Sequence, residues 1–367
     1  MKNCKFKTSM IVLLSVAGVS AVSCGKKKSS SDAYSVNSVA DMKLSSSFNL
    51  SLPSGFAKAS GQSTNLALDG GSMNVTAGKR SSEACRTIQQ ADMLFENLGS
   101  ISGMMCHLEA ESAQFKFGTK YLVKLVQGGQ TQEMPLWVDN SVAGSMTMYT
   151  CKSGSIAEKI VISSASSAGP KGTINFRGSE SGDSYASSVE FDFTTSGLKI
   201  LKGQNTFKNS TDSFASDTNI ELRDSGVSNI LMSNAGSSSS FGTFSDRGAV
   251  KFNGTLGQAV FKGSGSGGTQ TYSWSNRSTF DADGYTVDNS KATDDIKVEF
   301  SAIPAALASG YSIAAPTGWD CQTTETITVD LDTGSTASAH KACERNHNTN
   351  FQCFGADFEH GTAETLQ

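Results

Sequence analysis

Apolar residues recur at helical spacing in one stretch of the chain, between residues 83 and 110. They are separated by three or four positions and comprise Ala84, Ile88, Ala91, Phe95, Leu98, Ile101, Met105 and Leu108. This period indicates an amphipathic helix, and Ser82 and Glu83 supply a cap and an acid for its first turn. Because the pattern continues through Gly99 and Gly103, we expect one helix, about 40 Å long at 1.5 Å per residue. A turn that ends the helix at Gly99 is the alternative.

From residue 115 to residue 300 the apolar positions change to a period of two. Residues 188–194 (SVEFDFT) alternate polar and apolar side chains without a break, as a half-buried strand does. Turn-forming residues recur about every 10–15 residues, which indicates an antiparallel meander with one apolar face. The Ser/Gly-rich stretches 233–245 and 263–268 are interpreted as loops. Asn65–Val75 is interpreted as two short runs around an Asp-Gly-Gly turn. Strands are expected at Met42–Leu52, Lys120–Val126, Glu133–Val138, Ser145–Cys151, Lys159–Ser164, Thr173–Phe176, Ser188–Thr194, Lys199–Lys202, Asn219–Leu222, Val250–Phe252, Ala259–Lys262, Thr269–Ser275 and Lys297–Ser301.

The predicted fold is mainly β with one long helix (α+β). We expect an antiparallel β-meander that forms a curved sheet or an open barrel packed on the helix, followed by a disulfide-clamped C-terminal segment. This combination looks like that of periplasmic lipoprotein carriers, whose half-barrel holds acyl chains around a helix. The resemblance concerns the fold alone, because no motif accompanies it. The expected β-rich domain spans residues 42–301, and the C-terminal segment, 302–367, is either a small subdomain or packs back onto the sheet.

The first 23 residues have the pattern of a signal peptide. Residues 1–10 carry three lysines and no acid, and residues 11–19 (IVLLSVAGV) are apolar. A basic segment followed by a short apolar segment is typical of export signals. Spanning a bilayer takes about 20 apolar residues, and no other apolar run approaches that length, so we expect no membrane-spanning helix.

The end of this segment resembles the lipobox of bacterial lipoproteins. Ala21-Val22-Ser23-Cys24 matches best at Ser23 and Cys24 and departs at Ala21, where the family usually has Leu. The resemblance implies that Cys24 is acylated, becomes the first residue of the mature chain and holds it to a membrane. Gly25, in place of Asp, implies the outer membrane. Cleavage after Ala21 as an ordinary signal peptide is the alternative.

Residues 24–41 then form a flexible, Ser-rich tether. Lys26, Lys27 and Lys28 either add attraction to anionic head groups or only keep the tether solvated.

The cysteine count supports the lipid anchor. Of eight cysteines, Cys4 leaves with the signal and Cys24 carries the lipid. The other six are disulfide candidates, as expected for an exported protein: Cys85, Cys106, Cys151, Cys321, Cys343 and Cys353. On a continuous helix the first two lie about 30 Å apart, too far for a disulfide. We therefore expect them to pair with Cys151 or the C-terminal cysteines, and Cys343 is close enough in sequence to pair with Cys353.

Small residues share one flank of the expected helix. Gly99, Gly103 and Cys106 follow one another at four and three positions, which places them side by side on a helix. Side chains this small would let a neighbouring element approach closely.

Charge and composition exclude a nucleic-acid-binding role. The formal net charge is −4, and loss of the three signal-peptide lysines lowers it to −7 (−4 − 3). Charged residues make up 17%, below the usual figure of about 25%, and no basic stripe follows any predicted element. A low charge with many hydroxyl residues is typical of exported β-proteins.

Two acidic motifs resemble parts of known sites. Asp332–Ser335 (DTGS) resembles the aspartic-protease signature, which needs a second carboxylate, and the nearest mate is Asp224-Ser225-Gly226. Asp281–Gly284 (DADG) resembles a calcium loop, but Ala292 stands where an EF-hand has Glu, although Asp288 could contribute. We interpret both as turns.

Two further motifs have residue types used in catalysis. His340, Cys343, His347 and Cys353 are the types that bind zinc, although oxidation to disulfides competes. Gly182-Asp183-Ser184 matches serine-hydrolase fragments without the elbow such enzymes need. His107 and His360 have no evident partner in the sequence. We predict no metal and no cofactor.

These patterns predict a non-enzymatic, membrane-anchored lipoprotein with a structural or surface-interaction role. Its expected partners are the membrane, through lipid on Cys24, and a protein. The alternative is a carrier of a lipid-like apolar ligand, and an enzyme is disfavoured because no titratable groups converge in the sequence.

Overall fold

A computed structural model describes residues 58–59, 79–142, 145–166, 168–239, 242–267, 270–343, 349–350, 353 and 358–363. The expected strand at 42–52, the two short runs at 65–75, the signal peptide, the tether and Cys24 lie outside these residues. The described helices are α2 (Ser82–Ala110) and α3 (Ala337–Cys343), with single turns η3 (Ser112–Gln114), η4 (Asn289–Lys291) and η5 (Phe300–Ala302).

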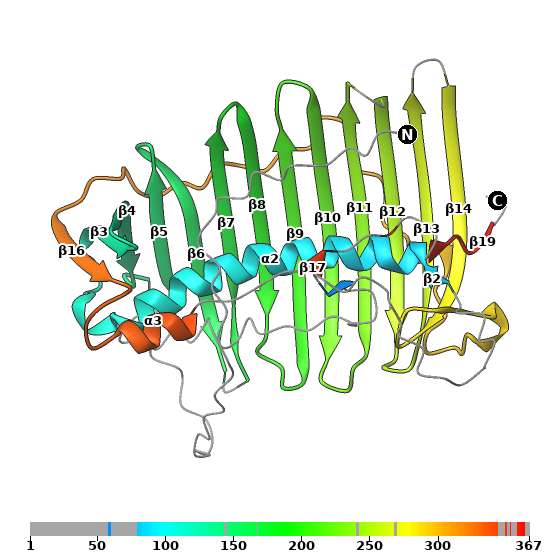
Figure 1. Ribbon diagram of the computed structural model, residues 1–367, viewed down its shortest axis with the longest axis horizontal. Helices are drawn as coiled ribbons and strands as arrows, with labels where there is room; N and C mark the ends of the chain where they lie inside the picture. Colours follow the sequence, from blue (N-terminus) through cyan, green and yellow to red (C-terminus); the bar gives the residue numbers. More distant parts are fainter. Residues whose placement is uncertain are drawn as a thin grey trace, which may run out of the picture.

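One large sheet dominates the molecule (Figure 1). Consecutive strands pair antiparallel from β3 to β14, as the alternating pattern predicted. These strands are β3 (Lys120–Gln127), β4 (Gln130–Asp139), β5 (Met146–Lys152), β6 (Ser155–Ala165), β7 (Pro170–Glu180), β8 (Asp183–Asp192), β9 (Leu198–Lys208), β10 (Asp212–Arg223), β11 (Ser228–Ser238), β12 (Gly242–Phe252), β13 (Leu256–Gly267) and β14 (Gln270–Asp281).

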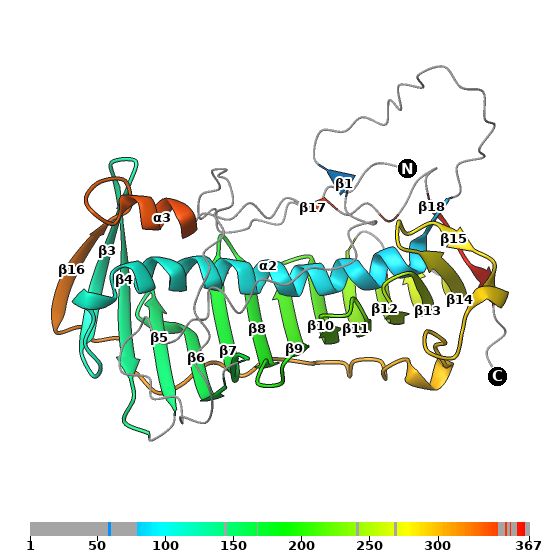
Figure 2. The same cartoon turned by 90° about the horizontal axis from the view of Figure 1, so that it is seen from below.

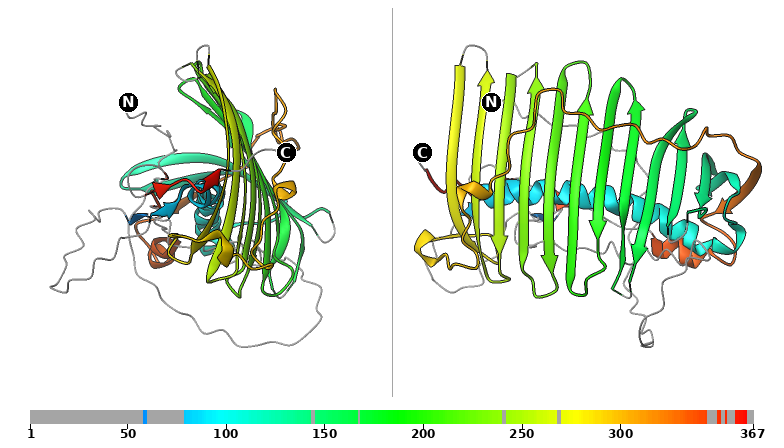
Figure 3. Two further views of the ribbon diagram at one scale, coloured as in Figure 1. Left: turned by 90° about the vertical axis from the view of Figure 1, so that its right-hand side faces the viewer. Right: turned by 180° about the vertical axis from the view of Figure 1, so that it is seen from behind.

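The described strands do not close into a barrel, which corrects the open-barrel alternative. At one edge β16 (Glu325–Asp330) pairs with β3, in parallel. At the other edge β15 (Thr286–Val287) and β19 (Thr362–Ala363) pair with β14. These edges lie at opposite ends of the molecule, so the sheet is an open, twisted layer (Figures 1 and 3).

Helix α2 crosses one face of the sheet, here called the helix face (Figure 2). It begins where the Ser81 side chain accepts a hydrogen bond from Ala84 N at 3.0 Å, one residue before the expected cap. Its described apolar side chains are buried in the main core together with residues of the strands; they are Ala84, Ile88, Ala91, Leu94, Leu98, Met105 and Leu108. Leu94 lies directly over Gly203, where an added Cβ would come within 2.4 Å of Leu94 Cδ1.

A second helix corrects the expectation of a single one. The short helix α3 lies beside the C-terminal half of α2, and a Cβ on Gly103 would come within 3.8 Å of the Cys343 carbonyl oxygen. The small flank noticed in the sequence therefore receives this helix. The sequence did not indicate α3, because seven residues give too short a pattern.

An extended segment, residues 298–324, crosses the opposite face and is here called the strap (Figure 3). The sheet holds its backbone through side chains: Ser233 Oγ donates to Ala305 O at 2.8 Å, and Lys159 Nζ donates to Thr317 O at 3.0 Å. The expected strand at 297–301 is wrong, since the chain there contains η5. Arg277 stacks on Phe300 and donates to Val298 O, which replaces strand pairing.

The Ser/Gly-rich stretches are strands rather than the expected loops. Residues 233–238 end β11, residues 242–245 begin β12, and residues 263–267 end β13. Their glycines make room for aromatic rings on neighbouring strands, which a pattern within one strand cannot show.

The C-terminal residues join the sheet and the N-terminal elements. Besides β16 and β19, β18 (Phe358–Glu359) pairs with β2 (Arg80–Ser81), and β17 (Thr349–Asn350) pairs with β1 (Lys58–Ala59).

Candidate functional site

The six candidate cysteines form three disulfides, and each one ties the C-terminal part to an earlier element. Cys85 and Cys106 of α2 pair with Cys353 and Cys343, respectively, and Cys151 of β5 pairs with Cys321. The expected Cys343–Cys353 pair is therefore wrong, while the expectation that the two helix cysteines pair elsewhere is confirmed. The sequence could not assign these partners because they lie more than 160 residues apart.

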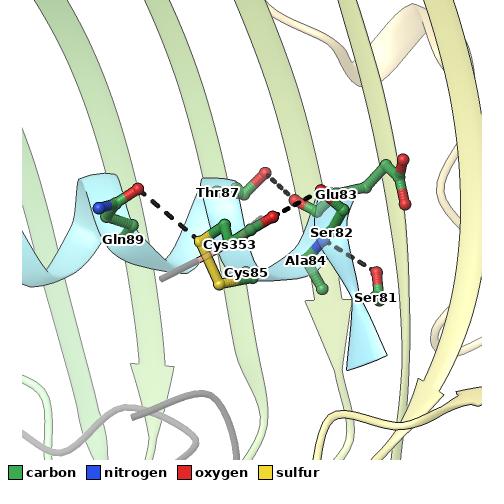
Figure 4. Close-up of a disulfide and its surroundings, with 8 residues drawn as sticks. All are labelled: Ser81, Ser82, Glu83, Ala84, Cys85, Thr87, Gln89 and Cys353. Carbon is green, nitrogen blue, oxygen red and sulfur yellow. Dashed lines mark hydrogen bonds between the residues drawn. A yellow bond between two sulfur atoms is a disulfide. The ribbon is translucent and has the colours of Figure 1, made fainter. Parts of the chain in front are cut away.

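Polar contacts surround the first disulfide (Figure 4). Ser82 Oγ donates to Cys353 O at 3.0 Å, and Thr87 Oγ1 donates to Glu83 O at 3.0 Å. The Glu83 carboxylate is 1% exposed and accepts from Gly361 N at 3.1 Å and from His360 Nδ1 at 3.0 Å. The start of α2 is thus fixed to the C-terminal residues covalently and by hydrogen bonds.

The acidic motifs are turns. Asp281 Oδ1 accepts from the backbone amides of Asp283 and Tyr285 in the connection after β14. Asp288 caps η4 by accepting from Ser290 N. Asp332 accepts from Gly128 N at 2.6 Å and is exposed. No group of metal-binding side chains occurs among the described residues.

The described residues of the zinc and hydrolase motifs form disulfides and a turn. Cys343 and Cys353 are oxidised in different disulfides, which removes two of the four candidate zinc ligands, and His347 lies outside the described residues. Gly182-Asp183-Ser184 belongs to the β7–β8 turn, where Gly182 has φ +90° and Ser184 Oγ donates to Lys208 O.

A chain of titratable side chains joins α2 to α3. His340 Nε2 donates to Glu111 Oε1 at 2.9 Å, and His340 Nδ1 lies 3.2 Å from His107 Nδ1. Burial, and then the neighbouring His340, lower the pKa of His107 to about 4. Burial raises the pKa of Glu111, but hydrogen bonds from Thr336, His340 and Gln114 outweigh it and lower that pKa overall. No sequence pattern indicated that these histidines are partners, since His107 and His340 are 233 residues apart.

A row of aromatic side chains crosses the helix face beyond α2, and we call it the aromatic row. Strand register places Tyr185, Phe207, Phe214, Phe244 and Tyr272 side by side across β8–β14, with Gly236 and Gly265 between them. Phe214 and Phe244 stack across Gly236 with ring centroids 6.4 Å apart, and Tyr272 is 46% exposed.

A second row, the polar row, lies between the aromatic row and α2. It contains Ser187, Asn205, Ser216, Asn234 and Asp246, which the register places two residues along each strand from the aromatic row. Glu158 and Phe176 extend it at one end and Trp274 ends it at the other. Burial raises the pKa of Asp246, partly offset by Arg86 of α2, and burial raises the pKa of Glu158 to about 6.

The geometry of the strands explains why these rows lie beside the helix. Residues in a strand advance about 3.4 Å each, so the aromatic row is about 14 Å along the strands from Gly203 and Gly248, which α2 contacts. A helix with its side chains reaches only about 5–6 Å from its axis. In Figure 1 no described element lies over the end of β7–β14 that carries the β7–β8 turn. We take the two rows as the candidate binding site.

The sequence did not single out these residues, although it carries a signal for them. In the β13–β14 and β7–β8 hairpins, glycine and aromatic residues stand at mirrored positions about the turn: Gly263 and Gly265 face Trp274 and Tyr272, and Gly178 faces Tyr185. Each ring lies over its glycine, since an added Cβ on Gly178 would come within 2.2 Å of Tyr185 Cζ.

No family model, no curated protein and no solved structure matches this chain. Among the described residues, no helix combines the length and the apolar character needed to cross a membrane.

Proposed function

We propose that the protein is a lipid-anchored lipoprotein of the bacterial outer membrane with a non-enzymatic structural or surface-interaction role. The lipobox-like sequence ending at Cys24 supports the anchor. The three disulfides use the six other cysteines of the mature chain, which suits an exported protein in an oxidising compartment.

The observation that carries the surface-interaction role is the direct contact between α2 and the sheet. Leu94 of α2 lies against Gly203 on β9. Thr87 of α2 lies close to Gly248 on β12, where an added Cβ would come within 2.5 Å of Thr87 Oγ1. A carrier built like a half-barrel around a helix would hold its ligand in this interface, which α2 occupies with its own side chains. The surfaces left for a partner are the outer faces and edges of the sheet.

Native mass spectrometry of protein extracted from its own membrane tests the anchor and the role together. We expect a tri-acylated chain beginning at Cys24, with six fewer hydrogens from three disulfides and no bound lipid. A chain beginning at Val22 without acylation would overturn the anchor. A stoichiometric lipid adduct would support the alternative, a carrier of an apolar ligand.

A partner assay then tests the interaction role. The lipid-free mature protein, incubated with isolated cell envelopes, is expected to sediment with them and to be released by an excess of unlabelled protein. If it stays in the supernatant, the surface-interaction role fails.

A further inference from the structure

We propose that the aromatic and polar rows together bind a linear, neutral oligosaccharide chain. The inference rests on the proposed surface-interaction role and names the chemistry of the partner. Four features of the two rows carry it: the ring platform, the polar atoms that lack partners, the low charge and the linear shape.

The rings form a platform rather than a packed core. The glycines of the aromatic row let the rings lie along the sheet, because an added Cβ on Gly265 or Gly236 would come within 2.8 Å of Tyr272 or 2.6 Å of Phe244. Tyr272 and Trp274 stack with ring centroids 5.6 Å apart. The electron-rich face of an aromatic ring attracts the polarised C–H groups on the flat face of a pyranose sugar.

Polar atoms in the two rows lack partners within the described chain. They are Tyr185 OH, Ser187 Oγ, Asn234 Oδ1, Asp246 Oδ1 and Trp274 Nε1. Asn234 is 4% exposed and Ser187 is 6% exposed, and leaving a buried polar group unpaired is destabilising. The set mixes acceptors, a donor and hydroxyls, and the hydroxyl groups of a sugar complement it because they donate and accept at once. These five atoms are buried, so a sugar would reach them once their side chains turn outward, whereas an acyl chain would leave all five without partners.

The charge of the two rows favours a neutral glycan over an anionic polymer as the ligand. The two rows contain no lysine or arginine, and their ionisable side chains are Glu158 and Asp246, both with raised pKa values, and Tyr185 and Tyr272. Arg86, on the neighbouring helix, already lies over Phe261 and beside Asp246. A phosphate- or sulfate-bearing chain would meet these carboxyl groups without a free cation in either row.

The shape of the site favours a linear ligand. The aromatic row follows α2 across β8–β14, and with about 4.8 Å between strands it extends about 29 Å. Successive rings therefore contact successive sugars of one chain.

The test is a titration of the lipid-free mature protein with chitohexaose and cellohexaose, followed by calorimetry and by tryptophan fluorescence. We expect binding that strengthens from the disaccharide to the hexasaccharide of the same series. Tyr272→Ala and Phe214→Ala are expected to weaken it about tenfold each, as the loss of one stacking partner does elsewhere. Val142→Ala, a change at another exposed apolar residue (65% exposed), is the matched control and is expected to leave binding unchanged.

Ser187→Ala separates binding from folding. Because Ser187 Oγ has no partner in the described chain, its removal is expected to leave thermal stability equal or higher while weakening hexasaccharide binding about fivefold. Retained affinity in this variant and in Tyr272→Ala would overturn the site.

The outcomes also distinguish this inference from the function on which it rests. If neither hexasaccharide binds but the protein still sediments with cell envelopes, the inference is wrong and the surface-interaction role stands. If oleate binds instead, and Tyr272→Ala weakens that binding, the rows bind an apolar ligand and the inference is again wrong. If nothing binds and nothing sediments, both proposals fail.

Discussion

The indole ring of Trp274 on β14 lies across the Cα atom of Gly263 on β13. A Cβ added to Gly263 would come within 2.3 Å of Trp274 Cζ2 and within 2.6 Å of Asp246 Oδ1. The glycine is therefore part of the packing of the ring, and the pair can be tested as a unit.

Gly263→Ala is expected to lower the free energy of unfolding by about 1–3 kcal/mol, the usual cost of overpacking. In a Trp274→Ala background the same change should cost less, because only the contact with the Asp246 side chain remains. Urea denaturation of the four proteins in this double-mutant cycle measures the coupling.

Gly172→Ala is the comparison, since its Cβ would lie 2.0 Å from the backbone oxygen of Val161. No side-chain deletion can relieve that contact. Equal costs of Gly263→Ala with and without Trp274 would contradict the explanation.

Removing the Cys151–Cys321 disulfide is expected to loosen the strap. The bond closes a loop with a sequence separation of 170, so Cys151→Ser with Cys321→Ser should cost about 3–5 kcal/mol of stability. Trp319, Tyr149 and Trp137 pack next to this bond, and their quenching by acrylamide should increase in the double variant.

Replacing Cys106 and Cys343 by serine provides the control. It should destabilise the protein without changing that quenching, because this bond joins α2 to α3. Unchanged quenching in the Cys151/Cys321 variant would show that the hydrogen bonds alone hold the strap.

His107 is expected to make the protein less stable in acid. Its pKa is lowered from 6.5 to about 4 in the folded chain, so between these values the unfolded state binds more protons, and stability falls as the pH drops. Urea denaturation at pH 7.5 and pH 4.5 should show a smaller loss in His107→Asn than in the parent protein. Equal losses in both proteins would contradict the shift.

Glu158 is expected to act in the opposite direction. Burial raises its pKa from 4.5 to about 6, although Thr150 Oγ1 donates to it at 3.1 Å. Above pH 6 the charged form is disfavoured in the folded state, and as the pH falls from 6 to 4.5 the folded state takes up more protons and gains stability. Glu158→Gln should therefore raise the free energy of unfolding at pH 8 by about 1–2 kcal/mol.

That gain should disappear below pH 4.5, where the carboxyl is protonated in both states. Chemical denaturation across pH 4–8 checks this, with Glu190→Gln, an exposed carboxylate on the next hairpin, as the control. A gain that does not depend on pH would mean that packing, and not charge, is responsible.

Local sequence patterns were sufficient to predict an element wherever its own residues show a helical or a strand period. The apolar spacing from Ala84 to Leu108 lies within α2, and the alternation around Phe191 lies within β8. Strand β11 has no such pattern, because its inward positions include Asn234 and Gly236. The residues paired with these two positions on the adjacent strand β12, Asp246 and Phe244, account for the polar residue and the glycine.

Long-range partners set the remaining features. The strap has no period of its own, since it is held by Arg277, Ser233 and Lys159 from three different strands. The aromatic row and the polar row become visible only when the strand register aligns residues from separate hairpins. For the same reason the sequence could count the disulfides and could not pair them.

The three disulfides are nested in the sequence. Cys151 and Cys321 lie between Cys106 and Cys343, which in turn lie between Cys85 and Cys353. A chain exported from its N-terminus presents Cys85, Cys106 and Cys151 to an oxidant first, and any pair among them is non-native. No correct bond can close until residue 321 has emerged, after every strand from β3 to β15 has been delivered. Under the proposed export, maturation of this protein therefore depends on thiols that stay reduced during translocation, or on an isomerase that reopens early pairs. The innermost disulfide, Cys151–Cys321, is the first native one that can form.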